Sequence, residues 1–258
     1  MIVAQQLSAV VGGVTLLQQV NLSVAPGELL MVLGPNGAGK STLLQALAGS
    51  IKVTQGSIEL SGQPLSHYAV RERAKRLACL SQQLAMEFDF TVQEVVALGR
   101  YSYGESKAEA QSAINRALIK VDMESFITRR YRSLSGGEQQ RVHLARVFAQ
   151  IDGVDATSSR YLLLDEHVAH LDLAHQQHIF QVLRNLLREK VGIVAVVHDL
   201  NLALAYADRV VLLHHGKAVA EGKPQEVLTI ERMGQVFEVA VEWAVCPQGR
   251  KWMVPKIK

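Results

Sequence analysis

The stretch Leu29-Leu-Met-Val-Leu33 is a continuous apolar run, and it leads directly into Gly34-Pro-Asn-Gly-Ala-Gly-Lys-Ser-Thr42. A short apolar run that ends in a glycine-rich turn predicts a buried strand, and the residues from Ser41 to Ala48 predict a helix after it. Glycines in such a loop let backbone N–H groups curl around phosphate oxygens at the start of the helix. The pattern therefore predicts a phosphate-binding loop between a strand and a helix.

Three polar side chains of this loop are expected to contact the ligand. Lys40 would reach the β- and γ-phosphates, Ser41 would place its hydroxyl on Mg²⁺, and Thr42 would add a hydrogen bond to the α-phosphate. The predicted nucleotide-binding residues are Gly34, Pro35, Asn36, Gly37, Ala38, Gly39, Lys40, Ser41 and Thr42. A nucleoside triphosphate and Mg²⁺ are thus the expected ligands of this loop, and the family resemblance described below implies that the nucleotide is ATP.

A second apolar run, Leu162-Leu-Leu-Asp-Glu166, delivers two neighbouring carboxylates. Buried strands are expected at Tyr161–Leu164 and Gly192–Val197, each followed by polar residues where a parallel sheet exposes its carboxyl ends. Asp165 would hold Mg²⁺ through water, while Glu166 would act as general base or orient the attacking water. The two carboxylates therefore have different expected roles.

The remaining pattern divides the chain into a sheet-rich part and a helical part. Alternating stretches at Ile2–Leu7 and Leu16–Val24 predict antiparallel strands, and Ser57–Leu60 continues that pattern. From Val92 to Ala149 the pattern is helical, and Ala108–Val121 is rich in good helix formers. We therefore expect a small antiparallel β layer beside the main sheet and an inserted helical lobe.

Composition excludes several classes of protein. The chain has 258 residues, 48% of them hydrophobic, which is enough apolar material for a large core. Its longest apolar runs fall far short of the roughly 20 residues that a bilayer span needs, and its first residues do not resemble an export signal. Only Cys79 and Cys246 are present, which indicates a reducing compartment. The formal net charge of +3 is mild and its basic residues are scattered, so a nucleic-acid partner is not expected.

The segment Leu134-Ser-Gly-Gly-Glu138 resembles the signature motif of ATP-binding-cassette (ABC) ATPases. Ser135 can also cap a helix that runs to about Gln150. The resemblance implies that this helix points its positive end at the γ-phosphate held by a second subunit. It further implies a head-to-tail homodimer in which Ser135, Gly136 and Gly137 bind the nucleotide of the partner.

Three further residues follow in the order that the family shows. Gln82 resembles the Q-loop glutamine that touches Mg²⁺ or the attacking water, although Gln83 is an alternative assignment. His198 resembles the switch histidine that hydrogen-bonds the γ-phosphate and positions Glu166, and Asp172 resembles the D-loop aspartate that links the two sites. The catalytic set implied by the resemblance is Glu166, His198 and Gln82, and the Mg²⁺ set is Ser41, Gln82 and Asp165.

The resemblance covers essentially the whole chain and implies a fold class. That class is α/β: a P-loop NTPase of the ABC ATPase fold, with a parallel-sheet core, an antiparallel β subdomain and an inserted helical subdomain. We expect one domain over residues 1–258. Residues 1–85 and 151–258 would form the nucleotide-binding core with its β subdomain, and about 86–150 would form the helical subdomain that carries the signature.

A closer resemblance is to ATPase subunits of importers for iron-siderophores, cobalamin and haem. It rests on Phe88-Asp-Phe-Thr-Val92, on Glu94-Val-Val-Ala-Leu-Gly-Arg100 and on the Val236-Phe237 tail. Leu171-Asp-Leu-Ala-His-Gln176 and the lengthened loop before Tyr161 resemble the haem-import branch in particular. The resemblance implies a haem importer, with a siderophore or cobalamin importer as the alternative.

The same resemblance implies two transmembrane permease subunits as partners, a periplasmic binding protein that acts indirectly, and a peripheral location on the cytoplasmic face of the inner membrane. An exporter motor would commonly be fused to membrane spans, and soluble ABC ATPases of translation or DNA repair usually carry two cassettes or a coiled-coil insertion. A nucleotide kinase could use the same phosphate loop but has no use for the signature segment. The sequence therefore favours the importer over these other classes.

The sequence also departs from the family pattern. Val11 stands where many members carry an aromatic residue that stacks on adenine, and His167 replaces the usual proline after the catalytic glutamate. Residues 151–160 are expected to form a surface loop longer than the usual connection. A metal site could be considered because of four nearby histidines, of which the last two would share a helix face: His167, His170, His175 and His178. No carboxylate or thiol completes a convincing ligand set, so a solvated or interface role is favoured over a metal site.

Overall fold

A six-stranded sheet forms the centre of the computed structural model, which describes residues 1–81, 88–153, 159–165, 172–247, 249 and 251–256. The strand order is β10-β9-β3-β8-β7-β6, and every neighbouring pair is parallel except β9 and β10. The strands are β3 (Leu29–Leu33), β6 (Leu77–Leu80), β7 (Arg160–Asp165), β8 (Val191–Val196), β9 (Arg209–His214) and β10 (Lys217–Gly222).

This sheet is covered on both faces, which explains why its strands are continuous apolar runs. In β3, the side chains of Leu29, Met31 and Leu33 belong to one hydrophobic cluster, while Leu30 and Val32 belong to a second cluster on the opposite face. Alternate residues of a strand point to opposite faces, so each face receives its own apolar layer. The sheet therefore positions its loops from a core that is packed on both sides.

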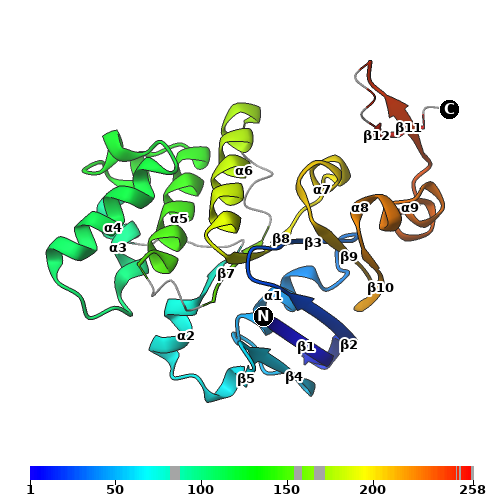
Figure 1. The fold of residues 1–258 in the computed structure, drawn as a ribbon, viewed down its shortest axis with the longest axis horizontal. Coiled ribbons are helices and arrows are strands. Elements are labelled where there is room, and N and C mark those ends of the chain that lie inside the picture. The colour runs from blue at the N-terminus through cyan, green and yellow to red at the C-terminus, as the bar shows by residue number, and fades with distance from the viewer. Residues whose placement is uncertain (82–87, 154–158, 166–171, 248, 250, 257–258) are drawn as a thin grey trace.

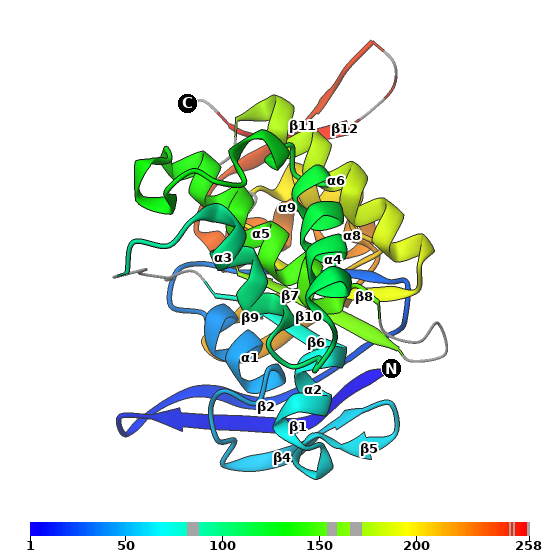
Figure 2. The same cartoon turned by 90° about the vertical axis from the view of Figure 1, so that its left-hand side faces the viewer.

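An antiparallel sheet of order β2-β1-β4-β5 covers one face, with helix α1 (Lys40–Leu47) packed in the same cluster. Figure 1 shows these strands below the central sheet, and Figure 2 shows them as a separate layer at the base of the molecule. The strands are β1 (Ile2–Val11), β2 (Val14–Val24), β4 (Gln55–Leu60) and β5 (Gln63–Pro64). The predicted antiparallel β layer is confirmed.

Helices cover the other face of the central sheet. Helix α6 (Leu173–Arg188) turns one apolar side to the core through Ile179, Phe180 and Leu183, and α7 (Leu200–Tyr206) follows the end of β8. Helix α2 (Val70–Arg76) precedes β6. The short 3-10 helices are Leu65–His67, Leu98–Arg100, Glu124–Phe126 and Tyr131–Ser133.

Three helices lie together beside the sheet: α3 (Val92–Ala97), α4 (Lys107–Ile119) and α5 (Gly136–Ile151). Each begins with a capping box, in which a Thr or Ser hydroxyl and a Glu carboxylate satisfy backbone N–H groups at the helix start. Buried Val95, Ile114 and Leu144 join their inner faces to the main core cluster. The helical segment expected between Val92 and Ala149 is thus present.

The chain ends in two small helices, α8 (Pro224–Val227) and α9 (Ile230–Phe237), and in a hairpin of β11 (Val241–Val245) and β12 (Lys251–Pro255). Figure 1 shows this hairpin at the opposite end of the molecule from α3 and α4. Within the described ranges, none of the helices is long and apolar enough to cross a membrane.

The fold class expected from the sequence is confirmed, with one local difference. The surface loop expected over residues 151–160 is shorter at both ends, because Ile151 is buried as the last residue of α5 and Arg160 is the first residue of β7. Residues 154–158 of that loop lie outside the described residues.

Candidate nucleotide site

Three neighbouring parallel strands bring the predicted site residues to one edge of the sheet. In the strand register, Val32 of β3 pairs with Val196 of β8, and Val196 pairs with Asp165 of β7. The backbone N–H of Val197 also donates to the carbonyl of Val32, at 3.2 Å. The loop after β3, the segment after β8 and the end of β7 therefore leave the sheet at the same level, with adjacent strands about 5 Å apart.

The phosphate loop is held in a conformation that only glycine adopts readily. Gly34 has φ 150° and a Cβ there would lie 2.2 Å from the carbonyl oxygen of Leu213, while Gly39 has φ 99° and a Cβ would lie 2.6 Å from that of Leu16. Both neighbours are backbone atoms of flanking strands and cannot move aside. Any side chain at these two positions would distort the loop.

The start of α1 fits a phosphate group. Its N-cap residue is Gly39, which has no side chain to satisfy the first N–H groups of the helix, so these groups suit an anionic ligand. Lys40 is 5% exposed, and its ammonium donates to the carbonyls of Gly34 at 2.9 Å and Pro35 at 3.0 Å. The loop thus keeps a buried positive charge on its inner side.

The remaining residues of the phosphate loop differ in their exposure to solvent. Asn36 and Gly37 are exposed at its tip, Ala38 is buried, and Ser41 and Thr42 are half-buried in the first turn of α1. The carbonyl of Ala38 accepts from the N–H of Gly216 at 3.1 Å, which ties the loop to the turn between β9 and β10.

Asp165 and His198 lie at the same sheet edge but differ in exposure. Asp165 is 4% exposed as the last residue of β7, whereas His198 is exposed two residues after β8 ends. A carboxylate and a hydroxyl are oxygen ligands of the kind that Mg²⁺ prefers, so Asp165 and Ser41 suit that cation. Gln82 and Glu166 lie outside the described residues, as do His167 and His170.

The signature segment forms the exposed start of α5. The N–H and hydroxyl of Ser135 both donate to the Glu138 carboxylate at 2.7 Å, and the N–H of Glu138 donates back to the Ser135 hydroxyl at 3.4 Å. The hydroxyl and backbone N–H of Ser135 lower the pKa of the Glu138 carboxyl, so this carboxylate stays charged. The predicted helix cap at Ser135 is confirmed.

Gly136 and Gly137 are not required by the packing of the described residues. Among these residues, nothing lies within 4 Å of a Cβ added to either glycine, and neither has a left-handed backbone conformation. Gly136 is exposed and Gly137 is half-buried. The missing side chains therefore leave the backbone at the start of α5 accessible to a group that approaches from outside.

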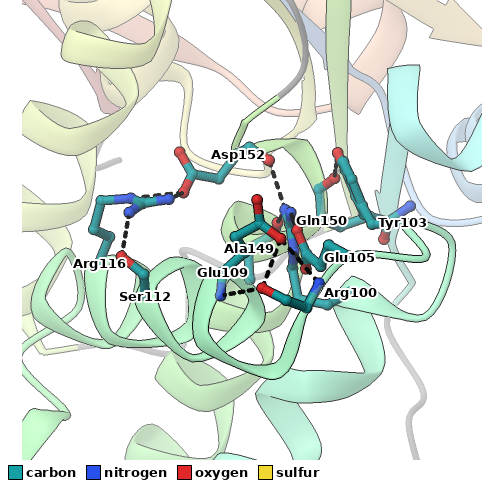
Figure 3. A network of polar contacts seen from close by, with 10 residues as sticks. Arg100, Tyr103, Glu105, Glu109, Ser112, Arg116, Ala149, Gln150 and Asp152 are labelled. Carbon is teal, nitrogen blue, oxygen red and sulfur yellow. Dashed lines mark hydrogen bonds and ion pairs between the residues drawn. The ribbon is translucent and has the colours of Figure 1, made fainter.

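The other end of α5 is fixed by a buried ion pair that sequence reasoning missed. Arg100 is 7% exposed and donates to both carboxylate oxygens of Glu105, at 2.7 and 2.5 Å (Figure 3). Its guanidinium also donates to the carbonyls of Ala149 at 2.7 Å and Asp152 at 2.5 Å. These bonds satisfy carbonyls that the end of a helix leaves without partners.

Two more side chains connect the end of α5 to its surroundings. The Tyr103 hydroxyl donates to the carbonyl of Gln150 at 2.6 Å, and the amide of Gln150 donates to the carbonyl of Ala74 at 2.8 Å, at the end of α2. The end of α5 is thus bound to the sheet-rich part of the chain, while its start at Ser135 is exposed.

Asp172 caps α6, where it accepts from the backbone N–H of His175 at 2.9 Å and contacts the His175 ring at 2.7 Å. These hydrogen bonds lower the pKa of the Asp172 carboxyl, and the bond from the backbone N–H has the largest effect. The His178 ring lies 3.0 Å from the carbonyl of Lys120, beside Asp122. The two histidines therefore contact separate groups, and the described residues contain no cluster suited to a metal ion.

The predicted adenine position has no aromatic side chain at the end of β1. Val11 is 47% exposed there, next to Gly12 and Gly13, which have φ 57° and 81°. An exposed valine offers an apolar contact but no ring for stacking.

Comparisons with known proteins agree with this geometry. The family model of ABC transporters matches residues 17–169, more than half of the chain. The chain is 41% identical over 255 residues to the hemin import ATP-binding protein HmuV of Rhodopseudomonas palustris (strain HaA2), covering 98% of this chain and 97% of that protein. It is 42% identical over 250 residues to HmuV of Bordetella avium, covering 96% and 95%.

Solved structures show the same fold. An inward-facing putative metal-chelate type ABC transporter has a TM-score of 0.82 at 26% identity, covering 100% of this chain and 98% of that one. A dimeric bacterial ABC transporter cassette has a TM-score of 0.76 at 27% identity, covering 87% and 99%. With its phosphate loop, its signature helix and these matches, the chain belongs to the ABC transporter family and is one of its ATPase subunits.

Proposed function

We propose that this chain is the ATP-hydrolysing motor of a haem importer. The observation that carries the proposal is the similarity, at about 40% identity and over nearly the full length, to proteins named for hemin import. The fold similarity to a putative metal-chelate type transporter supports the same chemical class of cargo. A ferric-siderophore or cobalamin importer is the second candidate.

The proposed ATP site is built on the loop after β3. Backbone N–H groups at the start of α1 and the Lys40 ammonium bind the β- and γ-phosphates, and the Thr42 hydroxyl adds a bond to the α-phosphate. Ser41, Asp165 and Gln82 would hold Mg²⁺, which neutralises charge on the phosphate oxygens. The burial of Lys40 supports this role, because a cation in a poorly solvated loop attracts phosphate strongly.

Hydrolysis requires an activated water molecule. Glu166 accepts a proton from this water, whose oxygen attacks the γ-phosphorus, while the bond to the bridging oxygen breaks and ADP leaves. His198 hydrogen-bonds the γ-phosphate and positions Glu166, and Gln82 touches Mg²⁺ or the water. The common level at which β7 and β8 end supports this grouping of residues.

Each site is completed by a second copy of the chain. In a head-to-tail homodimer, Ser135, Gly136 and Gly137 bind the γ-phosphate held by the partner, and Asp172 links the two sites. The open space around both glycines supports this role, since none of the described residues fills it. The start of α5 also carries the positive end of the helix dipole, which favours an anion.

The proposed assembly places this homodimer beneath two transmembrane permease subunits, on the cytoplasmic face of the inner membrane as a peripheral subunit. A periplasmic binding protein acts on it only indirectly, and no nucleic acid takes part. Gln82 would couple the bound nucleotide to a permease helix, so that closure of the dimer on ATP changes the access state of the permease.

The experiment that tests the chemistry replaces Glu166 with Gln in the assembled transporter. Glu166→Gln should still bind ATP but hydrolyse it at least roughly a hundredfold more slowly, because general-base catalysis commonly contributes that much. ATP binding is measured with a fluorescent analogue and hydrolysis by phosphate release. Near-normal turnover would show that another residue activates the water.

A further inference from the structure

Helix α7 starts directly beside the proposed switch residue His198. The Asp199 carboxylate accepts from the backbone N–H of Asn201 at 2.7 Å and so caps this helix. At the other end, the Tyr206 ring stacks on Phe180 of α6 with ring centroids 4.0 Å apart, and the Tyr206 carbonyl accepts from Arg184 at 3.0 Å. The far end of α7 is therefore fixed to α6, and its near end begins two residues after His198.

The near end is fixed by the C-terminal hairpin. The Asn201 amide donates to the carbonyl of Met253 at 3.0 Å, and the N–H of Met253 donates to the Asn201 side-chain oxygen at 2.8 Å. An amide side chain carries both a donor and an acceptor, so Asn201 pairs with the backbone of β12 at two points. Two bonds to one residue fix the direction of the side chain as well as its distance.

Met253 is itself held firmly. Its side chain is 4% exposed and belongs to the main core cluster together with Val241 and Ala203 of α7. The hairpin is closed by pairing along β11 and β12 and by the N–H of Lys256, which donates to the carbonyl of Ala240 at 2.9 Å. The partner of Asn201 is thus a well-packed strand, although Val245 and Trp252 of the same hairpin are exposed.

We infer that Asn201 is a positioning residue for His198, with the backbone of Met253 as its support. The inference rests on the proposed contact between His198 and the γ-phosphate. A seven-residue helix is about 10 Å long, so a tilt of roughly 6° about the Tyr206 end displaces the His198 end by about 1 Å. Misplacement of a reacting group by about 1 Å can lower a rate on the order of a hundredfold.

The test compares ATP hydrolysis by the assembled transporter with and without the Asn201 amide. Asn201→Ala should lower kcat by about tenfold while KM for ATP stays within about twofold, because the substrate-binding loop after β3 is untouched. Asn201→Asp has the same shape but presents a carboxylate oxygen to the Met253 carbonyl, and it should act in the same direction. It serves as the second variant if Asn201→Ala folds poorly by circular dichroism.

The matched control is Arg184→Gln at the other end of α7. It removes a side-chain bond to the same helix but leaves the pairing of Asn201 with Met253 in place. Since Tyr206 remains stacked on Phe180, kcat should stay within about twofold of the starting value. A fall equal to that of Asn201→Ala would mean that any loosening of α7 is sufficient, and it would overturn the specific role of Asn201.

A double-mutant cycle with His198→Ala separates positioning from general stability. Rates are measured by single-turnover release of labelled phosphate, which follows very slow hydrolysis. Asn201→Ala should lower the rate in the starting protein and leave it unchanged when His198 is already Ala. An equal fall in both backgrounds, or no fall in the starting protein, overturns the inference. If His198→Ala alone does not slow hydrolysis, it is the proposed catalytic role of His198 that fails.

Discussion

Removing the arginine of the buried ion pair at the end of α5 should destabilise the fold far more than removing the arginine of the exposed pair beside it (Figure 3). Arg100→Met keeps an unbranched apolar stem similar to that of arginine and removes the charged guanidinium. It leaves the Glu105 carboxylate, whose side chain is 17% exposed, without its partner, and the carbonyls of Ala149 and Asp152 lose a donor. Breaking a buried pair in this way costs about 3–5 kcal/mol of unfolding free energy.

Arg116→Met is the matched control. Arg116 pairs with Asp152 at 2.7 Å, but its side chain is 52% exposed, and an exposed pair contributes about 0–1 kcal/mol. Unfolding in urea, followed by circular dichroism, measures both variants under the same conditions. The difference between them should be about 3 kcal/mol, because burial rather than contact distance sets the cost.

The double variant Arg100→Met with Glu105→Met tests whether the unpaired Glu105 charge causes the loss of stability. It removes both charges, so the part of the loss that comes from the unpaired Glu105 carboxylate should be recovered, whereas the part that comes from the carbonyls of Ala149 and Asp152 should remain. Equal costs for Arg100→Met and Arg116→Met, or a double variant as unstable as Arg100→Met alone, would refute the account of this ion pair.

Two other predictions follow from the site and its surroundings. Mixing Ser135→Arg subunits with Lys40→Ala subunits should restore ATPase activity above either mutant homodimer, since one mixed dimer keeps one intact composite site; no gain on mixing would contradict the trans arrangement. Burial and, secondarily, the charge of Asp165 raise the pKa of the Cys79 thiol to about 11. The thiol loses its proton at a lower pH in the unfolded chain than in the folded one, so the free energy of unfolding should fall as pH rises from about 9 to 11, by up to about 1.4 kcal/mol per pH unit. Urea titrations at each pH measure this slope, and Cys79→Ala should remove the part that the thiol causes.

The fold could be predicted because its signals are local. The apolar run of β3, the glycines that follow it and the Ser135 cap with Glu138 each lie within a few consecutive residues, and the structure contains all three. The order of the chemical motifs then predicted which strand ends meet at one edge. The register between β3, β8 and β7 agrees with that expectation.

The parts that could not be predicted depend on distant contacts. Arg100 meets the Ala149 carbonyl across 49 residues, and Asn201 meets Met253 across 52 residues. No local pattern distinguishes a buried arginine from an exposed one, or an asparagine that pairs with a strand from one in solvent. The expected loop at residues 151–160 was misjudged for a similar reason, because the burial of Ile151 depends on the core beneath α5.

Transport itself provides the most direct test of the proposed function. The chain is assembled with a candidate haem permease in liposomes that contain ATP, and haem, cobalamin and a ferric siderophore are supplied in parallel with their matching binding proteins. Gln82→Ala is included because a coupling residue should weaken uptake more than it weakens ATP binding. Glu166→Gln serves as the inactive control.

If the chain is the motor of a haem importer, haem uptake requires ATP and is lost in Glu166→Gln. Uptake of cobalamin or siderophore without haem would contradict the proposed cargo while leaving the motor role intact. Absence of ATP-dependent uptake with every verified permease partner would contradict the importer function itself.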